Sequence, residues 1–506
     1  MDAWALFSVS DKKGSLELAQ WFSAQGIGIL ASGGTYRHLV EHGITATALE
    51  DLTGFDQVLD GRVKTLHPVI YAGLLSRRTP KDQEDVTKLG SKNIVAVVVN
   101  LYPFRQRAQE VAEASSGTST LVEEIDIGGV SLIRAAAKNY AHVMVLVDPG
   151  QYGEVMETQW IDHTEADRLR WAAHAFQHVA AYDAAIALTF SPEFSLDPDW
   201  VVSGLRQDAL RYGENPHQSG AFYPVKLNAG FAGARQWQGK ALSYNNLADA
   251  DAAWGLVRRL EESGVAVIKH QNPAAVAIAD TAIEALVKAQ AADPVSIFGG
   301  IVAFNGKVSE DAARVLRDIF LEVVLAPSFE PKALEILQSK KNLRVLEMPR
   351  SVWKPWEVRS IDGGFIVQTS DRLIRKYSEF EQVAGPPVDI TAYQTDVELA
   401  WATVSWAKSN AIVLVKDGVT RGIGSGQTNR VDAASQAIQR AGQHARGAVL
   451  ASDAFFPFGD VMDLAIKAGI AVVVQPGGSQ RDQESIDRAE HGQVPLFFTH
   501  ERHFRH

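Results

Sequence analysis

The chain has 506 residues, 46% of them hydrophobic and 22% charged, which is the composition of an ordinary globular protein. Its 49 basic and 60 acidic residues give a net charge of −11, which argues against a general binder of nucleic acid or anionic membranes. The absence of cysteine excludes disulfides, thiolate metal sites and a cysteine nucleophile.

Strand-like and helix-like patterns alternate over the first ~190 residues, as a parallel α/β sheet requires. In chain order, the patterns predict strands at 4–10, 27–32, 94–100 and 142–148, and helices at 13–26, 35–43, 130–140 and 165–188. Two prolines with Ser and Asp then predict a linker near 190–203.

A second α/β region begins near 204, and at about 150 residues per domain the chain is long enough for roughly three units. Predicted strands in this region include 265–269, 295–299 and 411–418. A stretch rich in Trp, Pro and charge at 351–360 divides the region into two lobes. The chain shows no repeat of solenoid type.

The segment Ser32-Gly33-Gly34-Thr35 lies between a predicted strand and a predicted helix. Glycines let backbone approach an anion, and hydroxyl and helix-start N–H groups can donate to phosphate. The alternative is a tight turn in which Ser or Thr caps the helix. A dinucleotide fingerprint is rejected because Gly26 and Gly28 precede the strand rather than follow it.

Polar residues also follow later elements of this region. Arg62 and Lys64 occupy alternate positions, so they share one face of an extended segment and could converge on an anion; the alternative is a solvated basic turn. Tyr102 follows a very apolar strand, Asp126 precedes a glycine pair, and Lys138 lies on a predicted helix. Together these residues offer Lys, Tyr and Asp beside a phosphate-type loop.

The sequence "VIKHQNP" places Lys269 and His270 side by side at the end of an apolar run. The strand is expected to stop near Asn272-Pro273, because proline cannot donate to a β-ladder. Neighbouring strand residues point to opposite faces, so the pair can serve one site only at the strand end, where open α/β sheets bind ligands. The alternative is a solvated strand edge.

Further segments combine polar and glycine residues in patterns suited to ligands. They are 211–218, 296–306 (predicted as a strand with a glycine pair), 421–432 (predicted as a polar hairpin-like loop) and 452–460 (an exposed aromatic cluster bracketed by carboxylates). His174 and His178 are four apart on one predicted helix, as metal ligands can be, but their Ala-rich surroundings favour a packing role.

These motifs together resemble the bifunctional purine-biosynthesis family that joins phosphoribosylaminoimidazolecarboxamide (AICAR) formyltransferase to inosine monophosphate (IMP) cyclohydrolase. The resemblance spans essentially the whole chain. It is carried by "SVSDK", "SGGT", "GRVKTLHP", "NLYPF", "IDIGG", "AAAKN", "LRYGENPHQ", "LSYNNLADADAA", "KHxNP", "FGGIVAFN", "SNAIV", "GIGSGQTNRVD", "SDAFFPF", "QPGGSxRD" and the terminal "RHFRH".

The resemblance implies a cyclohydrolase domain of methylglyoxal-synthase-like fold at 1–195. It also implies a formyltransferase domain at 196–506, made of two cytidine-deaminase-like α/β subdomains without zinc that divide near 351–375. The expected partners are AICAR, formyl-AICAR and the co-substrate 10-formyltetrahydrofolate, with no metal needed for chemistry. A homodimer is expected, with formyltransferase sites at the subunit interface.

The site residues are carried over motif by motif. The resemblance implies that the first domain holds nucleotide through Ser8, Ser10, Lys12, Ser32, Gly34, Thr35, Arg62, Lys64 and Thr65, with Lys64, Tyr102, Asp126 and Lys138 around the ring closure. In the second domain it implies an AICAR site of Arg211, Tyr212, Lys269, Phe298, Gly299, Asn410, Arg430, Arg502 and His506. His270 is the expected proton acceptor, assisted by Lys269 and Asn272, with Phe458 and Asp460 towards the folate.

Two positions depart from the family pattern. Ala274-Ala275 stands where Cys-Gly is common, and Gly459 stands where Arg commonly follows "FFPF". Neither removes a residue expected to carry chemistry. Rival interpretations are a nucleotide sensor without turnover, which the intact Lys269-His270-Asn272 set argues against, and another α/β transferase or deaminase.

The first residues lack a basic stretch followed by a long apolar core, and runs such as 94–100 are of strand length. The sequence therefore predicts a cytoplasmic protein that binds neither membrane nor nucleic acid.

Overall fold

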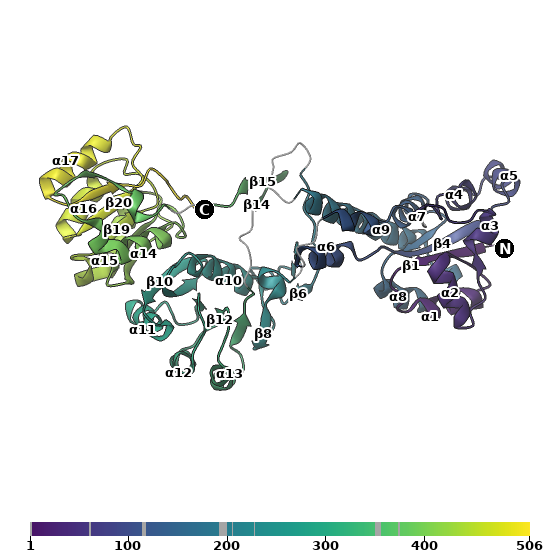
Figure 1. Cartoon of the computed structure of the whole chain (residues 1–506), viewed down its shortest axis with the longest axis horizontal. Coiled ribbons are helices and arrows are strands. Elements are labelled where there is room, and N and C mark those ends of the chain that lie inside the picture. The colour runs from purple at the N-terminus through teal and green to yellow at the C-terminus, as the bar shows by residue number, and fades with distance from the viewer. Residues whose placement is uncertain are drawn as a thin grey trace. The chain divides into compact units, whose positions relative to one another are not determined.

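The computed structural model describes residues 3–59, 62–113, 118–191, 200–204, 206–226, 228–349, 356–372 and 375–506. The chain forms two compact units, residues 1–205 and 206–506 (Figure 1). The family-based boundary at 195 stays a prediction.

The first unit contains a parallel sheet of five strands in the order β3-β2-β1-β4-β5. The strands are β1 (Ala3–Val9), β2 (Gly28–Ala31), β3 (Thr47–Ala48), β4 (Asn93–Asn100) and β5 (Met144–Leu146). The four predicted strands are confirmed as β1, β2, β4 and β5. β4 reads as a nearly continuous apolar run because both faces of the parallel sheet are covered.

Helices cover both faces of this sheet (Figure 1). Leu6, Leu30 and Val97 join the core packed by α4, α7 and α9, whereas Phe7 and Ile29, on the other face, pack with α1 and α8. The helices are α1 (Ser15–Ala24), α2 (Gly33–Glu41), α3 (Leu49–Thr53), α4 (Pro68–Leu75), α5 (Pro80–Lys88), α6 (Phe104–Glu113), α7 (Gly128–Lys138), α8 (Tyr152–Met156) and α9 (Glu165–Phe190).

The start of α9 is set by a capping box. The Thr164 hydroxyl accepts from the Asp167 N–H at 3.2 Å, and the Asp167 carboxylate accepts from the Thr164 N–H at 2.9 Å. Two helix-start donors are thereby satisfied, and the acidic side chain complements the positive end of the helix dipole. The predicted helix at 165–188 is confirmed and runs two residues further.

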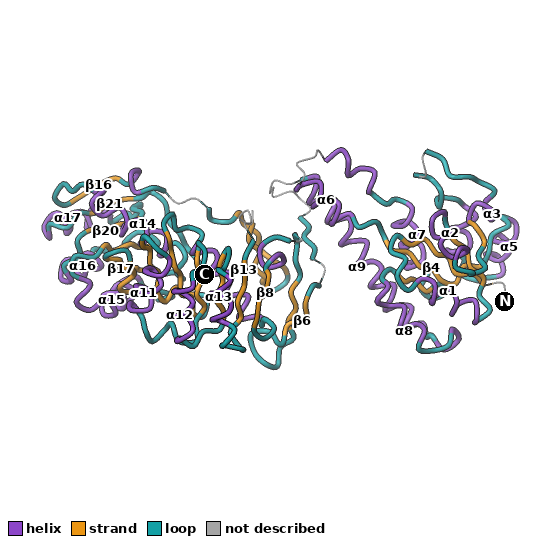
Figure 2. Tube along the Cα trace, turned by 60° about the horizontal axis from the view of Figure 1, so that its bottom comes forward, coloured by secondary structure: helices purple, strands orange, loops and turns teal. Residues whose placement is uncertain are grey.

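The second unit contains a sheet of twelve strands in the order β16-β21-β20-β19-β17-β18-β10-β9-β11-β12-β13-β8 (strands orange in Figure 2). Its strands are β8 (Arg235–Gln238), β9 (Ser263–Lys269), β10 (Asn272–Ala279), β11 (Ile301–Phe304), β12 (Val323–Ala326), β13 (Arg344–Glu347), β16 (Glu381–Ala384), β17 (Ile412–Lys416), β18 (Val419–Gly424), β19 (Val449–Ser452), β20 (Val472–Gln475) and β21 (Leu496–Phe498). Two separate hairpins are β6 (Asp208–Leu210) with β7 (Gly220–Phe222), and β14 (Trp356–Ile361) with β15 (Gly364–Thr369).

The twelve strands form two halves with the same element order. Each half runs strand, helix, two-strand hairpin, helix, strand, helix, strand, helix, strand, beginning with β8 in the first half and β16 in the second. The halves meet where Ala277 of β10 pairs with Val419 of β18. The helices are α10 (Tyr244–Val257), α11 (Ala282–Ala292), α12 (Glu310–Asp318) and α13 (Pro331–Leu337) in the first half, and α14 (Gln394–Val404), α15 (Arg430–Ala441), α16 (Asp460–Ala468) and α17 (Asp482–Gly492) in the second.

The two halves share one hydrophobic core on one face of the sheet and have separate cores on the other face. α10 and α14 pack in a common core on one face of the sheet. On the other face, α11 to α13 pack against the first half and α15 to α17 against the second. The β14–β15 hairpin falls within the predicted division at 351–375, of which residues 351–355 and 373–374 lie outside the described residues.

The structure corrects two sequence expectations. Residues 295–299 form turns rather than a strand, because Gly299 has φ 73° and its N–H donates to the Phe320 carbonyl; the strand begins at Ile301. The predicted loop at 421–432 contains the end of β18 and the start of α15. The strand expected to stop near Asn272-Pro273 does end there, as β9 at Lys269, and Asn272-Pro273 opens the partner strand β10, where proline is tolerated in the first residues next to a bulge.

The glycines of 421–426 have a packing role beyond turn geometry. A side chain on Gly422 or Gly424 would collide with the carbonyl oxygens of Ala437 and Ala433 in α15. These glycines let the helix backbone lie directly against β18.

Candidate functional sites

In the first unit, the residues implied to bind nucleotide gather at the carboxyl ends of β1, β2 and β4. The strand order reverses between β1 and β4, and this is the place where open α/β sheets bind ligands. Asn100, the last residue of β4, bridges the switch point. Its side-chain amide oxygen, Oδ1, accepts from the backbone N–H groups of Ser10 and Asp11 at 2.5 and 2.8 Å. No role was predicted for Asn100 from the sequence, although the motif "NLYPF" begins with it.

The start of α2 carries the phosphate-type loop. The Ser32 hydroxyl lies 2.8 Å from the Ser8 hydroxyl and does not cap the helix. The Thr35 hydroxyl accepts from the Val9 N–H at 3.0 Å. Because the first N–H groups of a helix have no partner within the helix, the region around Gly34 can donate to an anion. Of the two sequence interpretations, this geometry favours anion binding over a side-chain-capped turn.

Lys12 completes this loop. Its ammonium donates to the Val9 carbonyl and lies 3.2 Å from the Thr35 hydroxyl. Burial lowers the pKa of Lys12, and the positive charge of Lys64 lowers it further. Two lysines whose positive charges repel each other form a site that a phosphate dianion would neutralise.

Asp126 lies just before α7 and also faces Lys64. Burial raises its pKa, while the Gly129 N–H, which donates to its carboxylate at 2.7 Å, and the charge of Lys64 oppose that rise. A side chain on Gly128 would collide with the buried Thr65 hydroxyl, and one on Gly129 with the Asp126 carboxylate. The glycine pair therefore brings Thr65 and Asp126 together.

The remaining three implied residues of the first unit lie in the loop before α4, just after β4 and at the end of α7. Arg62 forms an exposed ion pair with Glu123. Tyr102 follows β4 and is 38% exposed. Lys138 and Asp126 lie at opposite ends of α7, an 11-residue helix that is about 16 Å long.

In the second unit, strand register places the implied residues along one edge of the large sheet. Lys269 pairs with Asn272, Ile268 with Ile301, and Ile412 with both Gly424 and Ser452. Four segments therefore share this edge of the sheet. They are the turn that follows Lys269, the Phe298-Gly299 segment before β11, Asn410 before β17 and Asp453 after β19. The four strand steps from β9 to β19 correspond to about 19 Å, which is enough for two substrates.

His270 lies at the tip of the β9–β10 hairpin. His270 and Gln271 form a two-residue turn with φ of 54° and 61°, a left-handed conformation that favours glycine. Asp249 of α10 holds the turn, since its carboxylate accepts from the Gln271 N–H at 2.9 Å. Burial raises the pKa of Asp249, and the backbone N–H groups of the turn oppose the rise. Strained backbone held by a partly buried carboxylate is a common feature of functional sites.

Lys269 and Asn272 flank this turn. The Lys269 ammonium donates to the Phe298 carbonyl at 2.9 Å, which places Phe298 and Gly299 next to the hairpin. The Asn272 amide donates to the His270 carbonyl at 3.0 Å. The Phe298 ring is 61% exposed and lies 5.0 Å from the Phe320 ring, so an apolar face is available beside the two polar side chains.

Asn410 and Arg430 form a second group on this edge. The Arg430 guanidinium donates to the side-chain amide oxygen of Asn410 at 2.7 Å and forms an ion pair with Asp453. The Arg430 side chain is only 5% exposed, so in this structure it orients the Asn410 amide from the protein interior. Asp453 is fully buried, and its carboxylate also accepts from the Ala411 N–H at 3.1 Å. No role was predicted from the sequence for Asp453 or Asp249, although both lie within the motifs quoted above.

The other implied residues are more exposed. Arg211 lies over the Tyr212 ring and donates to its hydroxyl at 2.7 Å. Phe458 is 49% exposed and has Arg481 5.0 Å from its ring centroid, while Asp460 begins α16. Phe456 is fully buried, so the aromatic cluster at 452–460 is exposed only in part.

At the departure Gly459, a side chain would collide with the Arg488 guanidinium. Arg502 and His506 are exposed in the C-terminal tail.

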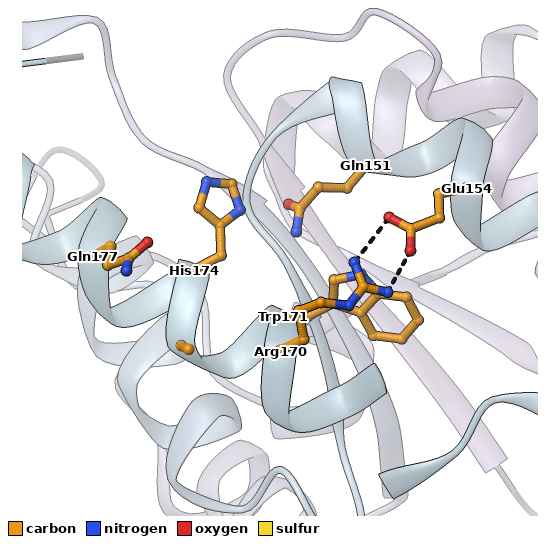
Figure 3. Close-up of a pocket in the computed structure, with 7 residues that line it drawn as sticks. Gln151, Glu154, Arg170, Trp171, His174 and Gln177 are labelled. Carbon is orange, nitrogen blue, oxygen red and sulfur yellow. Dashed lines mark hydrogen bonds and ion pairs between the residues drawn. The ribbon is translucent and has the colours of Figure 1, made fainter. Parts of the chain in front are cut away.

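Outside these groups, a shallow pocket lies between α8 and α9 (Figure 3). It is lined by Gln151, Glu154, Arg170, Trp171, Ala173, His174 and Gln177, none of them an implied site residue. Arg170 donates to Glu154 at 3.2 Å across it. His178 lies one turn beyond His174 on α9, and burial lowers its pKa. Within the described ranges, no group of three or more His, Cys, Asp or Glu side chains could hold a metal ion.

Across the part of the chain that the structure describes, no helix is long and apolar enough to cross a membrane.

Comparisons with known proteins match both units. The family model described as an AICARFT/IMPCHase bienzyme matches residues 136–440, and an MGS-like domain model matches 14–131. A "Bifunctional purine biosynthesis protein PurH" of Thermoanaerobacter sp. (strain X514) is 44% identical over 99% of both chains. Proteins of the same name from Halalkalibacterium halodurans and Anoxybacillus flavithermus are 46% and 44% identical over 99% of each chain.

A solved structure titled "Crystal structure of ForH" is 33% identical over 37% of this chain and 98% of its own, with a TM-score of 0.33, too low to compare the folds. The family model covers more than half of the chain, and the curated relatives align along nearly all of it. The chain therefore belongs to the AICARFT/IMPCHase bienzyme family.

Proposed function

We propose that this chain transfers a formyl group from 10-formyltetrahydrofolate to AICAR in its second unit and cyclises formyl-AICAR to IMP in its first. Similarity to bifunctional purine-biosynthesis proteins over nearly the whole chain supports both activities. The observation that carries the proposal is the Lys269-His270-Asn272 hairpin, which presents a proton acceptor, a cation and an amide together at a sheet edge.

In the formyl transfer, the 5-amino nitrogen of AICAR attacks the formyl carbon. A bond forms between these atoms, His270 accepts the amino proton, and the bond from the formyl carbon to N10 of the folate breaks. N10 receives a proton, which yields tetrahydrofolate. Lys269 and Asn272 stabilise the oxyanion, where one well-placed donor can contribute about 3–4 kcal/mol.

In the cyclisation, the carboxamide nitrogen of formyl-AICAR attacks the formyl carbon of the same molecule, and loss of water gives IMP. Because the step is intramolecular, holding the substrate folded supplies much of the acceleration. Lys12, Lys64 and the start of α2 bind the phosphate, and Asp126, beside Lys64, moves a proton. Tyr102, just after β4, and Lys138, at the other end of α7 from Asp126, are the remaining proposed contributors.

The active form is a cytoplasmic homodimer whose formyltransferase sites combine residues of both subunits, as the resemblance implies. Mixing and re-associating two inactive variants, His270→Ala and Asn410→Ala, tests sharing of the site. If His270 and Asn410 of one site come from different chains, hybrids regain one intact site, and about a quarter of wild-type activity returns. If both residues come from one chain, no hybrid contains an intact site, and activity stays absent.

The decisive assay gives the purified protein AICAR and 10-formyltetrahydrofolate. The proposal expects tetrahydrofolate and IMP in equal amounts. Formation of tetrahydrofolate without IMP would remove the cyclohydrolase assignment. Absence of both products would favour a nucleotide-binding sensor that has kept the pockets without turnover.

A further inference from the structure

The last residues of the chain are fixed to the loop that carries Asn410. After β21 ends at Phe498, the His503 N–H donates to the Asp453 carbonyl at 2.9 Å. The Ser409 N–H then donates to the Arg505 carbonyl at 2.9 Å, and the Arg505 N–H donates to the Ser409 hydroxyl at 3.3 Å. Asp453 is also the partner of Arg430. The tail backbone is thus attached to the same buried network that orients Asn410.

Side chains in the tail alternate between outside and inside. Arg502, Phe504 and His506 are exposed, whereas His503 is buried and Arg505 is half-buried. Such alternation is typical of an extended segment lying on a surface, in which a shift by one residue exchanges all outward and inward positions. The group that fixes this register therefore decides which side chains the tail presents.

Among residues 500–506, His503 has the most deeply buried side chain, at 1% exposure. Its Nδ1 lies 2.7 Å from the Asp371 carboxylate, and its ring packs edge-on against Trp401 with centroids 5.0 Å apart. Within the described residues, Nε2 is buried without a hydrogen-bond partner. The pairing with Asp371 therefore fixes the imidazole, and neither proposed reaction step uses this histidine.

Cationic side chains surround Asp371 and hold the same region. The guanidinium groups of Arg505 and Arg259 lie 3.9 and 4.9 Å from the centroid of the Trp406 ring. Arg259 also donates to the Asp371 carbonyl at 2.5 Å. Burial alone would raise the pKa of Asp371, but the His503 hydrogen bond and the charges of His503, Arg259 and Arg505 lower it below its ordinary value. A carboxylate at this position offsets repulsion between the two arginines.

We propose that His503, held by the Asp371 carboxylate, is a positioning residue of the formyltransferase site. It fixes the register of the tail so that Arg502 and His506 face outward beside Asn410, where they bind the nucleotide. The inference rests on the proposed formyltransferase function, in which Arg502 and His506 contact AICAR, while His503 and Asp371 act only through the tail.

The test measures kcat and the KM for each substrate in the full-length protein, together with cyclisation of supplied formyl-AICAR. His503→Ala should raise the KM for AICAR roughly tenfold, as expected for loss of one hydrogen bond to a charged group, and change kcat by less than about threefold. Cyclisation should be unchanged. His503→Asn, whose amide nitrogen can occupy the place of Nδ1, should restore most of the AICAR affinity.

His500→Ala is the matched control. His500, just after β21, also pairs with a carboxylate, that of Glu381 at 2.8 Å, but both side chains are about half exposed. Within the described residues, neither side chain hydrogen-bonds to Ser409 or Asp453. This variant should keep wild-type kinetics. A rise in the KM for AICAR equal to that of His503→Ala would overturn the specific role of His503.

A mutant cycle separates positioning from general structural damage. Arg502→Ala should weaken AICAR binding strongly in the wild type and much less in the His503→Ala background, because a misplaced Arg502 contributes little. Fully additive losses would contradict the inference. If His503→Ala does not fold, Asp371→Asn replaces it in the cycle and should give the same non-additivity.

The wild-type assay separates failure of the proposed function from failure of the role inferred for His503. A wild-type protein without formyl transfer would refute the proposed function. Active wild type with unchanged AICAR affinity in His503→Ala would refute only the role of His503.

Discussion

Carboxylates and amides that are buried or partly buried organise the residues that face each candidate site. Asn100, Asp249 and Asp453 bind backbone N–H groups of the loops next to the candidate catalytic residues. Each is a short polar side chain at the end of a strand or on a helix facing one. Their removal would leave donors unsatisfied in a low-dielectric interior, which costs about 1–3 kcal/mol for each group.

Asp126→Asn should separate stability from activity in the first unit. Burial raises the pKa of Asp126, so the folded state favours the neutral acid. The stability associated with that neutral form is present at low pH and is lost as pH rises through the raised pKa of the folded state. At neutral pH the asparagine should therefore raise the unfolding temperature of the first unit while cyclisation falls at least about 100-fold.

Thermal unfolding and cyclisation of supplied formyl-AICAR, each measured from pH 5 to 8, check this prediction. The stabilisation should shrink towards the acidic end of the range. A variant that is less stable than wild type at pH 8, or that cyclises normally, would contradict the role of Asp126.

At the residue level, the sequence identified groups that carry charge but not the groups that hold them. Lys269 and His270 stand out because two cationic-capable side chains interrupt an apolar run. Asp453 does not, since a carboxylate beside Phe455 and Phe456 is not distinguishable from a solvated one until Arg430 is placed against it. The network depends on contacts between residues 20 to 100 positions apart, which local patterns do not report.

The β9–β10 hairpin is the element on which the proposed formyl transfer depends. Its two-residue turn has both central residues at positive φ, yet they are His270 and Gln271 rather than Asn-Gly. The left-handed conformation costs roughly 1–2 kcal/mol for a residue with a side chain. The Asp249 carboxylate stabilises the turn by accepting the Gln271 N–H, so the backbone of His270 is fixed before substrate arrives.

Substitutions at Gln271 test this element without touching the proton acceptor. Gln271→Gly should leave stability unchanged or higher, because glycine adopts positive φ without strain, whereas Gln271→Val should lower it by about 2 kcal/mol relative to the glycine variant. The valine variant should also lose formyl transfer activity. Chemical denaturation of the second unit and the formyl-transfer rate check both expectations, and equal stability of the two variants would contradict the strained-turn account.

Elements with strong periodicity were predictable, and turns between them less so. The alternating patterns predicted four of the five parallel strands of the first unit, all but the two-residue β3, and the long helix α9. The pattern at 295–299 has strand-forming residues, but Gly299 bonds to Phe320 outside the ladder and ends that possibility. At 421–432, the glycines suggested a loop because nothing local shows that α15 lies directly on β18.

On the scale of the whole molecule, the proposed function assigns the two chemical steps to separate compact units. The residues proposed for cyclisation lie within 1–205, and those proposed for formyl transfer within 206–506. The duplicated element order of the second unit was not visible as a sequence repeat, since matching strands share burial and order rather than residue identity. Family resemblance, rather than periodicity, supplied the reaction.

Separation of the units predicts complementation between full-length variants. His270→Ala should make no formyl-AICAR, and Asp126→Asn should make formyl-AICAR but little IMP. An equimolar mixture should convert AICAR to IMP at up to about half the wild-type rate, because formyl-AICAR released by one protein can be cyclised by the other. Chromatographic measurement of IMP checks this prediction. A mixture no better than Asp126→Asn alone would show that the intermediate does not pass through solution.

The most direct test of the two-site account is the pair of half-reactions in His270→Ala. Formyl transfer from 10-formyltetrahydrofolate to AICAR should fall to background, while cyclisation of supplied formyl-AICAR should proceed at the wild-type rate. Loss of both half-reactions together, in a variant that unfolds at the wild-type temperature, would contradict the assignment of the two activities to separate units.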